Sequence, residues 1–213
     1  MAVALARTGK HEEGSRGLSL FLVPMRFPFV EGFASTGNKE PSPNGIYIHR
    51  LKNKLGTKIV PTAELSLNKV EAYQIGSLNN GVKSISPVLN ITRMHSASGS
   101  VSGLGRCLAI ARAYSTVRAI NGGRTLLKDV PLHTYTLAKV GLLYRGLMVF
   151  LYATIHLLGK DEVGTASLDE KLRLRLSTPV IKGFAADKAV TGMEECMAAL
   201  GGQGYMEENI IPR

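Results

Sequence analysis

Short apolar and alternating runs occupy the first part of the chain. Residues 17–24 form a compact apolar run that ends at a proline, and residues 63–67 alternate between apolar and polar side chains. Both patterns are typical of β-strands. Residues 1–7 and 46–48 have the same character, whereas residues 32–44 are rich in Gly, Ser, Pro and Asn and indicate a loop. So few strands cannot form a sheet covered on both faces, and we expect an incomplete antiparallel sheet.

After residue 80 the pattern becomes helical. Apolar side chains recur at helical spacing in residues 82–118, 132–158 and 168–200. The third segment is followed by Gly201 and Gly202, which is typical of a helix C-terminus. Three long helices joined by short connections predict an antiparallel bundle.

The change of pattern near residue 80 predicts two structural parts. We expect residues 1–80 to form a partial β-domain and residues 81–213 to form a helical bundle. The predicted fold class is therefore α+β, a partial antiparallel β-domain followed by an antiparallel helical bundle.

Two stretches need an interpretation of their own. Residues 95–105 consist largely of Ser, Gly and Ala, and we interpret them as helical positions where a neighbouring backbone approaches closely. The longest apolar stretch, residues 142–158, contains Arg145 and His156 and falls short of the roughly 18 uninterrupted apolar residues of a membrane span. We predict a buried helix there, no membrane span, and a soluble intracellular protein, mitochondrial or cytoplasmic.

Disulfide and metal chemistry have little support. The two cysteines, Cys107 and Cys196, are too few for a disulfide framework or a four-thiolate zinc site, and both have apolar helical neighbours. None of the five histidines stands at the spacing of metal ligands. We therefore predict buried, reduced thiols and no metal.

The formal net charge of +10 indicates an affinity for anions such as nucleic acid, acidic lipid or a phosphate-rich cofactor. The basic residues are spread along the chain rather than collected in one run. Arg106, Arg112 and Arg118 are six residues apart, a step that turns a helix by about 240°, so they do not form one basic stripe. This spacing weakens the prediction of a nucleic-acid-binding helix.

Two positions are candidates for binding a phosphate. Arg118 precedes a turn formed by Asn121 and two glycines, where a guanidinium can bind a phosphate through two hydrogen bonds. The glycine-rich run at residues 201–204 is either an ordinary helix stop or a place where the backbone approaches a ligand. The adjacent carboxylates at residues 194–195 and 207–208 point apart on a helix, so neither pair predicts acid–base catalysis.

Five segments, in order, resemble the C-terminal part of the acyl-CoA dehydrogenase family and span nearly the whole chain. They are RGLSLFLVP at residues 16–24, LKNKLGTKIVPTAEL at 51–65, VLNITRMH at 88–95, VRAINGGRTLLKDVPLH at 117–133 and ECMAALGGQGYMEENIIPR at 195–213. The second and last segments together are most similar to the branch that includes the bacterial adaptive response to DNA alkylation.

The resemblance implies an FAD-dependent flavoprotein that oxidises an acyl-CoA thioester between its α and β carbons. In this family a glutamate removes the α-proton while the flavin accepts a hydride from the β-carbon. By the domain order of the family, the resemblance implies that residues 1–80 are a partial middle β-domain and that residues 81–213 are the C-terminal helical bundle, with its last helix or helices missing. In the family, FAD lies between the β-domain and the bundle and reaches a neighbouring subunit. A homodimer or homotetramer is therefore implied as well.

The resemblance also implies roles for particular residues in binding FAD. Arg118 matches the family arginine that contacts the pyrophosphate of FAD. Gly201, Gly202 and Gly204 match a turn that lets the backbone approach the same cofactor. Asn121, which we assign to the same site, stands where many members have an aromatic residue.

For the acyl-CoA, Arg93 matches an arginine near the substrate and Asn90 matches a polar substrate contact. The catalytic glutamate is expected beyond Arg213 in most members, and a second branch places it where this chain has Thr92, which is no carboxylate base. We therefore predict a fragment of an acyl-CoA dehydrogenase-like oxidoreductase that is inactive alone. A non-catalytic DNA-binding module or an assembly partner derived from the same family are the alternatives.

Overall fold

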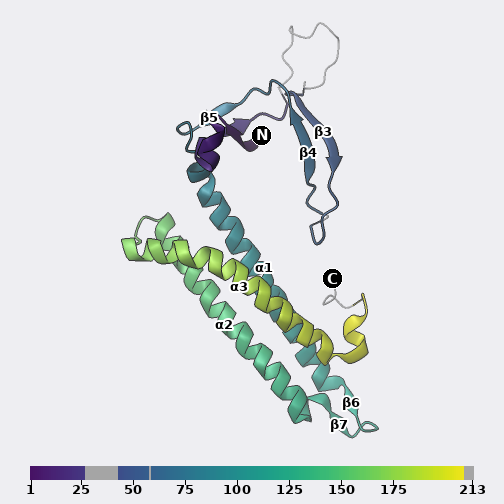
Figure 1. Ribbon diagram of the computed structural model, residues 1–213. Coiled ribbons are helices and arrows are strands. Elements are labelled where there is room, and N and C mark those ends of the chain that lie inside the picture. The colour runs from purple at the N-terminus through teal and green to yellow at the C-terminus, as the bar shows by residue number, and fades with distance from the viewer. Residues whose placement is uncertain (27–42, 58, 209–213) are drawn as a thin grey trace. The chain divides into compact units, whose positions relative to one another are not determined.

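The computed structural model describes residues 1–26, 43–57 and 59–208 of the 213-residue chain. The chain divides into two compact units, Met1–Pro87 and Val88–Arg213, whose elements are labelled in Figure 1. The first unit consists mainly of strands and the second mainly of helices. The predicted α+β class, with antiparallel strands followed by a helical bundle, is therefore confirmed.

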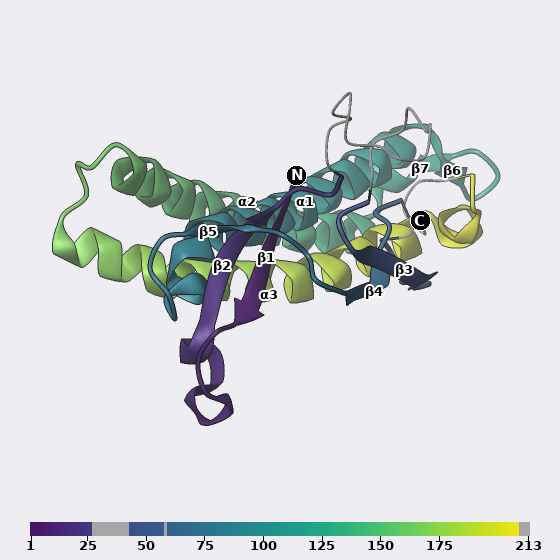
Figure 2. The same cartoon turned by 90° about the horizontal axis from the view of Figure 1, so that it is seen from above.

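Short antiparallel strands build the first unit. Strands β1 (Ala2–Arg7), β2 (Leu18–Val23) and β5 (Tyr73–Ile75) form a sheet in the order β1-β2-β5, while β3 (Ile46–Leu51) and β4 (Ala63–Leu67) form a separate hairpin. The pairing of β1 with β2 can be followed in Figure 2. Four of these strands were predicted. The fifth, β5, was missed because three residues with a central glutamine are too few to display alternation.

One buried asparagine connects two distant parts of this unit. Of the predicted loop at residues 32–44, only Pro43 and Asn44 lie within the described residues. The Asn44 side-chain nitrogen donates to the carbonyl oxygens of Pro24 (2.7 Å) and Glu71 (2.8 Å). Its side-chain oxygen accepts from the backbone N–H of Glu71 (2.9 Å). The buried amide is thus satisfied while it joins the segment after β2 to the segment before β5.

Three long helices dominate the second unit. They are α1 (Gly81–Val117), which begins in the first unit, α2 (Pro131–Glu162) and α3 (Leu168–Ala199). The connection from α1 to α2 contains the two-residue strands β6 (Ala119–Ile120) and β7 (Thr125–Leu126) and the 3₁₀ turn η2 (Leu127–Asp129), and the 3₁₀ turn η3 (Gly201–Tyr205) follows α3. The three predicted helices are confirmed to within a few residues at each end.

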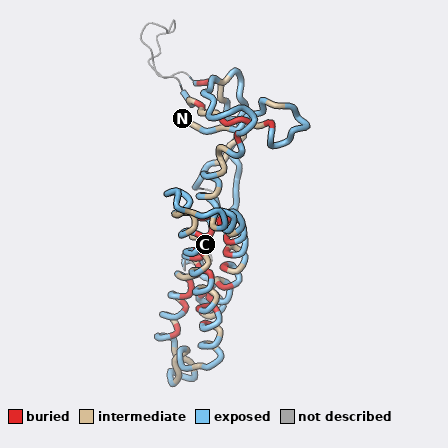
Figure 3. The backbone as a smooth tube through the Cα atoms, turned by 90° about the vertical axis from the view of Figure 1, so that its left-hand side faces the viewer, coloured by how far each residue is buried: buried red, intermediate tan, exposed pale blue. Residues whose placement is uncertain are grey.

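The core of the second unit lies where the three helices face one another, as the buried positions in Figure 3 indicate. Leu104 of α1, Leu147 of α2 and Ile181 of α3 are each at most 1% exposed. Gly192 of α3 makes room for Leu104, because a Cβ at this glycine would lie 2.6 Å from the Cδ1 atom of the leucine. The absence of a side chain at residue 192 therefore sets how closely α1 and α3 pack.

Side-chain atoms of neighbouring helices, rather than backbone atoms, pack against two of the glycines of α1. A Cβ on Gly105 would lie 2.7 Å from the ring of Tyr144, and a Cβ on Gly103 would lie 3.2 Å from the methyl group of Met193. Residues 95–105 are helical, as predicted. The prediction that a neighbouring backbone approaches them is wrong, because an aromatic ring and a thioether occupy that space.

Helix α2 is apolar on more than its core-facing side. Leu147 and Leu151 are buried, whereas Leu142 and Val149, which lie on the opposite side, are more than 70% exposed. By length and composition this helix could also cross a membrane, and 28% of its most apolar window is buried in the structure. The predicted burial of residues 142–158 therefore holds for one face of the helix only.

The turn between α2 and α3 is held by a capping box and an ion pair. The Ser167 hydroxyl accepts from the backbone N–H of Glu170 (3.3 Å), and the Glu170 carboxylate accepts from the backbone N–H of Ser167 (2.9 Å). The Lys160 ammonium donates to the same carboxylate. These contacts, the lysine first, lower the pKa of Glu170 to about 2.

This lowered pKa predicts a loss of stability in acid. Since the pKa of Glu170 is lower in the folded chain than the 4.5 of a free glutamate, its contribution is complete above about pH 4.5 and declines as the pH falls towards 2. We expect Glu170→Gln to lower the urea midpoint at pH 6 and to do so less at pH 3. Glu162→Gln, which removes an exposed carboxylate at the end of α2, is the matched control and is expected to change neither midpoint. A constant effect of Glu170→Gln across this range would contradict the role of the ion pair.

Candidate functional site

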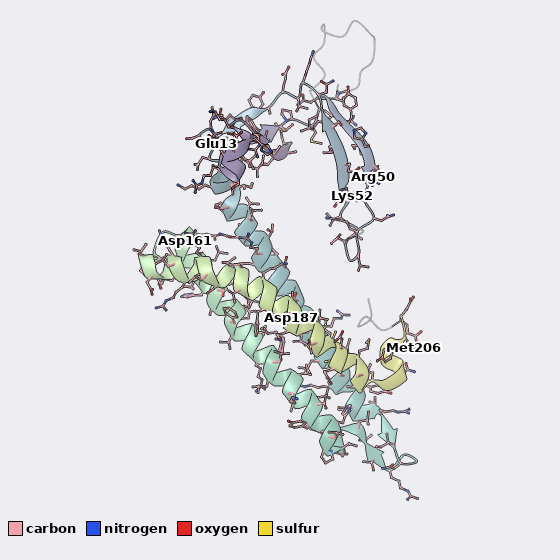
Figure 4. The ribbon with its side chains drawn as sticks, in the orientation of Figure 1. Glu13, Arg50, Lys52, Asp161, Asp187 and Met206 are labelled. Carbon is pink, nitrogen blue, oxygen red and sulfur yellow. The ribbon has the colours of Figure 1, made fainter. Side chains whose placement is uncertain are left out.

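A pocket of about 660 Å³ lies within the second unit, where the segments after α1 and α3 meet the start of α2. It is lined by Tyr114, Arg118, Ile120, Leu127, His133, Ala198, Ala199, Leu200, Gly201, Gly202, Gln203 and Met206. Met206, at the end of the turn after α3, is labelled in Figure 4. The lining brings together residues that are more than eighty positions apart in the sequence.

Arg118 is placed at this pocket by a short hairpin. The residue follows the last turn of α1, and its carbonyl oxygen accepts from the backbone N–H of Leu127 (2.9 Å). The connection between β6 and β7 turns through Asn121, Gly122 and Gly123, all with positive φ, a conformation that asparagine and glycine adopt more readily than other residues. These residues shape the hairpin that fixes the backbone of Arg118, although none of the three lines the pocket.

The opposite wall is the turn η3 after α3. Gly201 has a φ of +62°, which ends the helix, and neither Gly201 nor Gly202 has any atom within 4 Å of where a Cβ would stand. Both glycines line the pocket, and the space where their Cβ atoms would stand is open. Gly204 differs, because a Cβ on it would collide with the carbonyl group of Met197. Gly204 lets the turn fold back onto the last turn of α3.

The charge of the pocket favours an anion. Arg118 is exposed and forms no ion pair with any carboxylate of the described residues, and the lining contains no Asp or Glu. The C-terminal ends of α1 and α3 point carbonyl dipoles towards this region, which opposes an anion. The N-terminus of α2 has the opposite polarity and begins at Pro131, two residues before the lining residue His133. The guanidinium and this N-terminus are the two groups that make the pocket attractive to negative charge.

His133 is a lining residue that the sequence analysis missed. Among the described residues, its Nε2 is the buried side-chain nitrogen or oxygen that has no hydrogen-bond partner. The ring also lines a second pocket of about 190 Å³, together with Arg112, Ser115, Lys128, Thr134, Leu137 and Ala138. Metal-ligand spacing in the sequence assigned no role to His133. The available signal was the position of His133 in the first turn of a helix, directly after a glycine turn and a proline.

The residues predicted to contact acyl-CoA lie elsewhere on α1. The Arg93 guanidinium donates to the Asn90 side-chain oxygen (3.1 Å), so these two residues form a local pair. At 1.5 Å per residue, Arg93 is about 37 Å along the chain from Arg118. Thr92, where one branch of the family has its base, donates its hydroxyl to the Leu89 carbonyl oxygen (2.9 Å). The structure thus separates the two predicted groups of residues.

Neither cysteine is placed for chemistry. Cys107 and Cys196 are both free and buried in the core of the bundle. Burial raises the pKa of the Cys107 thiol and raises that of Cys196 to about 12, so both remain protonated at neutral pH. Across residues 1–26, 43–57 and 59–208, no three His, Cys, Asp or Glu side chains are grouped so that they could hold a metal ion.

Comparison with known sequences identifies the fold family. Residues 79–213 match the acyl-CoA dehydrogenase C-terminal domain. The chain belongs to the acyl-CoA dehydrogenase family. It is 46% identical over 216 aligned residues to acyl-CoA dehydrogenase family member 11 of Caenorhabditis elegans, with 100% of this chain and 33% of that protein covered. This establishes the family that the sequence motifs had indicated.

A solved structure and a bacterial sequence give two further comparisons. The crystal structure of ACDH-11 from C. elegans in complex with C11-CoA superposes with a TM-score of 0.84 at 44% identity, over 99% of this chain and 34% of that one. The putative acyl-CoA dehydrogenase AidB of Escherichia coli is 27% identical over 92% of this chain and 33% of its own length. The chain thus spans about a third of the length of these acyl-CoA dehydrogenase relatives. The predicted resemblance to the family and to its alkylation-response branch is confirmed.

Proposed function

We propose that the second unit binds the adenosine diphosphate end of FAD in the pocket bordered by Arg118 and the Gly201–Gly202 backbone. The proposal depends chiefly on one observation: a cation that forms no ion pair among the described residues and a glycine backbone without side chains border the same pocket. The volume of about 660 Å³ is in the range of small-molecule and cofactor sites. The family to which the chain belongs supports FAD as the occupant.

Each wall of the pocket has a distinct task in this proposal. The Arg118 guanidinium binds the diphosphate through charge-assisted hydrogen bonds, which are shorter and stronger than neutral ones. Gly201 and Gly202 let the backbone come close to the ligand, because a Cβ would project into the open space beside them. Gly204 and Asn121 act indirectly by fixing the turn after α3 and the hairpin after α1.

The wider activity that we propose is oxidation of an acyl-CoA thioester by a protein of which this chain is part. FAD would supply the hydride acceptor for that chemistry. Asn90 and Arg93 are our proposed contacts to the acyl-CoA, and their polar and positively charged groups suit a polyanionic substrate. Neither they nor Thr92 offers a carboxylate, so we assign no proton-abstracting base to this stretch of α1. A homo-oligomer that shares FAD between subunits is part of the same proposal.

Isothermal titration calorimetry of the purified chain with FAD, ADP and adenosine tests the cofactor site. We expect saturable binding of FAD and ADP that weakens as salt is raised, because the main contact is between a guanidinium and phosphates. Adenosine, which lacks the diphosphate, is expected to bind at least tenfold more weakly. Equal affinity for ADP and adenosine, or no heat of binding with any of the three, would contradict the proposal.

A further inference from the structure

We infer that His133 is a second anchor for the dinucleotide, with its imidazole donating a hydrogen bond to an oxygen of the diphosphate. The inference depends on the proposed function, since it assigns a residue to the same pocket. His133 is the last residue of the segment at residues 117–133 that resembles the family, but the resemblance assigns it no role. What points to it is the environment of its ring in the structure.

The Nε2 atom of His133 is shielded from solvent and pairs with nothing in the part of the chain that the structure describes. Buried polar atoms almost always have a hydrogen-bond partner, because an unmet buried donor or acceptor costs about 1–3 kcal/mol. Thr154 and Thr178, on the same helix and on α3, show the usual arrangement, since each donates to a carbonyl oxygen of its own helix. We therefore expect the imidazole of His133 to form a hydrogen bond with a group that the described part of the chain does not supply.

The surroundings of the ring indicate what kind of partner fits. The lining of the larger pocket brings Arg118 to the same space, and the lining of the smaller one brings Arg112 and Lys128. Among the residues that the structure describes, neither lining contains a carboxylate that could accept from the imidazole. An oxygen-rich anion satisfies both the unpaired nitrogen and the surrounding positive charge. A diphosphate, already proposed for the larger pocket, is such an anion.

A rotation of the His133 ring would let it donate a hydrogen bond to a ligand in the larger pocket. The ring lines the pocket, while its Nε2 is turned against protein atoms. The second torsion of histidine is broad and nearly two-fold, so the imidazole has a second preferred orientation about this torsion. We therefore expect the ring to reorient towards the ligand when ADP binds. Position N3 at the start of α2 keeps the turned ring beside the helix N-terminus, which also attracts the phosphates.

Binding measurements on matched variants test the assignment. We expect His133→Leu to weaken ADP binding about tenfold, the size of one hydrogen bond to a charged group. His133→Gln, which keeps an N–H donor at a similar reach, is expected to recover most of that affinity. His156→Leu, at an exposed histidine of the same helix outside the pocket lining, is expected to leave ADP binding unchanged.

Nuclear magnetic resonance of the unaltered chain provides an independent readout. With labelled histidine, addition of ADP is expected to move the imidazole signal of His133 and to leave those of His11, His49, His95 and His156 in place. If wild-type chain binds no ADP, the cofactor proposal itself fails. If it binds ADP while the His133 signal stays in place and His133→Leu binds equally well, only the role of His133 is overturned.

Discussion

Arg118→Gln is expected to weaken the binding of ADP and FAD by between about 10-fold and 100-fold. The guanidinium is exposed, forms no ion pair among the described residues and borders the pocket that lacks any lining carboxylate. Hydrogen bonds to charged groups are worth about 1.5–3 kcal/mol, which corresponds to this range of affinity. Glutamine preserves much of the side-chain volume and removes the charge. Calorimetry at two salt concentrations is the measurement.

The salt dependence distinguishes a phosphate contact from a general effect of net charge. Arg106→Gln makes the same change of charge on α1 at an exposed position that does not line the pocket. This control is expected to retain both the affinity and its decline with salt, whereas Arg118→Gln loses most of that decline. If the two variants weaken ADP binding equally, Arg118 has no special place in the site.

Leu104→Ala is expected to destabilise the chain by about 2–5 kcal/mol, the usual cost of truncating a fully buried leucine. Leu104 is 0% exposed and fills the space that Gly192 leaves on α3. The truncation would leave a cavity among the buried side chains of the bundle, which adds to the cost of the lost apolar contacts. Urea denaturation followed by circular dichroism measures the change in the free energy of unfolding.

Leu142→Ala is the matched control for this truncation. Leu142 is a leucine of α2 that is 74% exposed, so its replacement is expected to change the unfolding free energy by less than about 0.5 kcal/mol. A loss comparable to that of Leu104→Ala would contradict the burial pattern described for the second unit. It would mean that the outer face of α2 is covered in solution.

The three long helices could be predicted because their signals are local. Apolar spacing marks residues 82–118, 132–158 and 168–200, and glycines at 201–202 mark the last end. Observed bounds differ by a few residues only. The strands β5 and β6–β7 had no such signal, since strands of two or three residues exist only through pairing with a partner.

Part of the candidate site could also be predicted from the sequence. Arg118 and the glycines at 201–202 were candidates from the turns in which they stand, and the resemblance to the acyl-CoA dehydrogenase family assigned them to FAD. The structure brings these three residues to one pocket. Gly204 was grouped with them, yet it packs against Met197. Its role depends on how the turn after α3 folds back, which spacing alone does not reveal.

The sequence by itself determined the class of fold, the long helices and, through its motifs, the family of the chain. The fold class and the helices follow from residues that lie close together in the chain. The family follows from motifs that resemble those of its members. Only the tertiary structure decided that His133 lines the same pocket as Arg118 and Gly201, that side chains fill the spaces at Gly103 and Gly105, and that α2 is covered on one face. These features arise from packing between segments far apart in sequence, where shape and burial, rather than local propensity, select the neighbours.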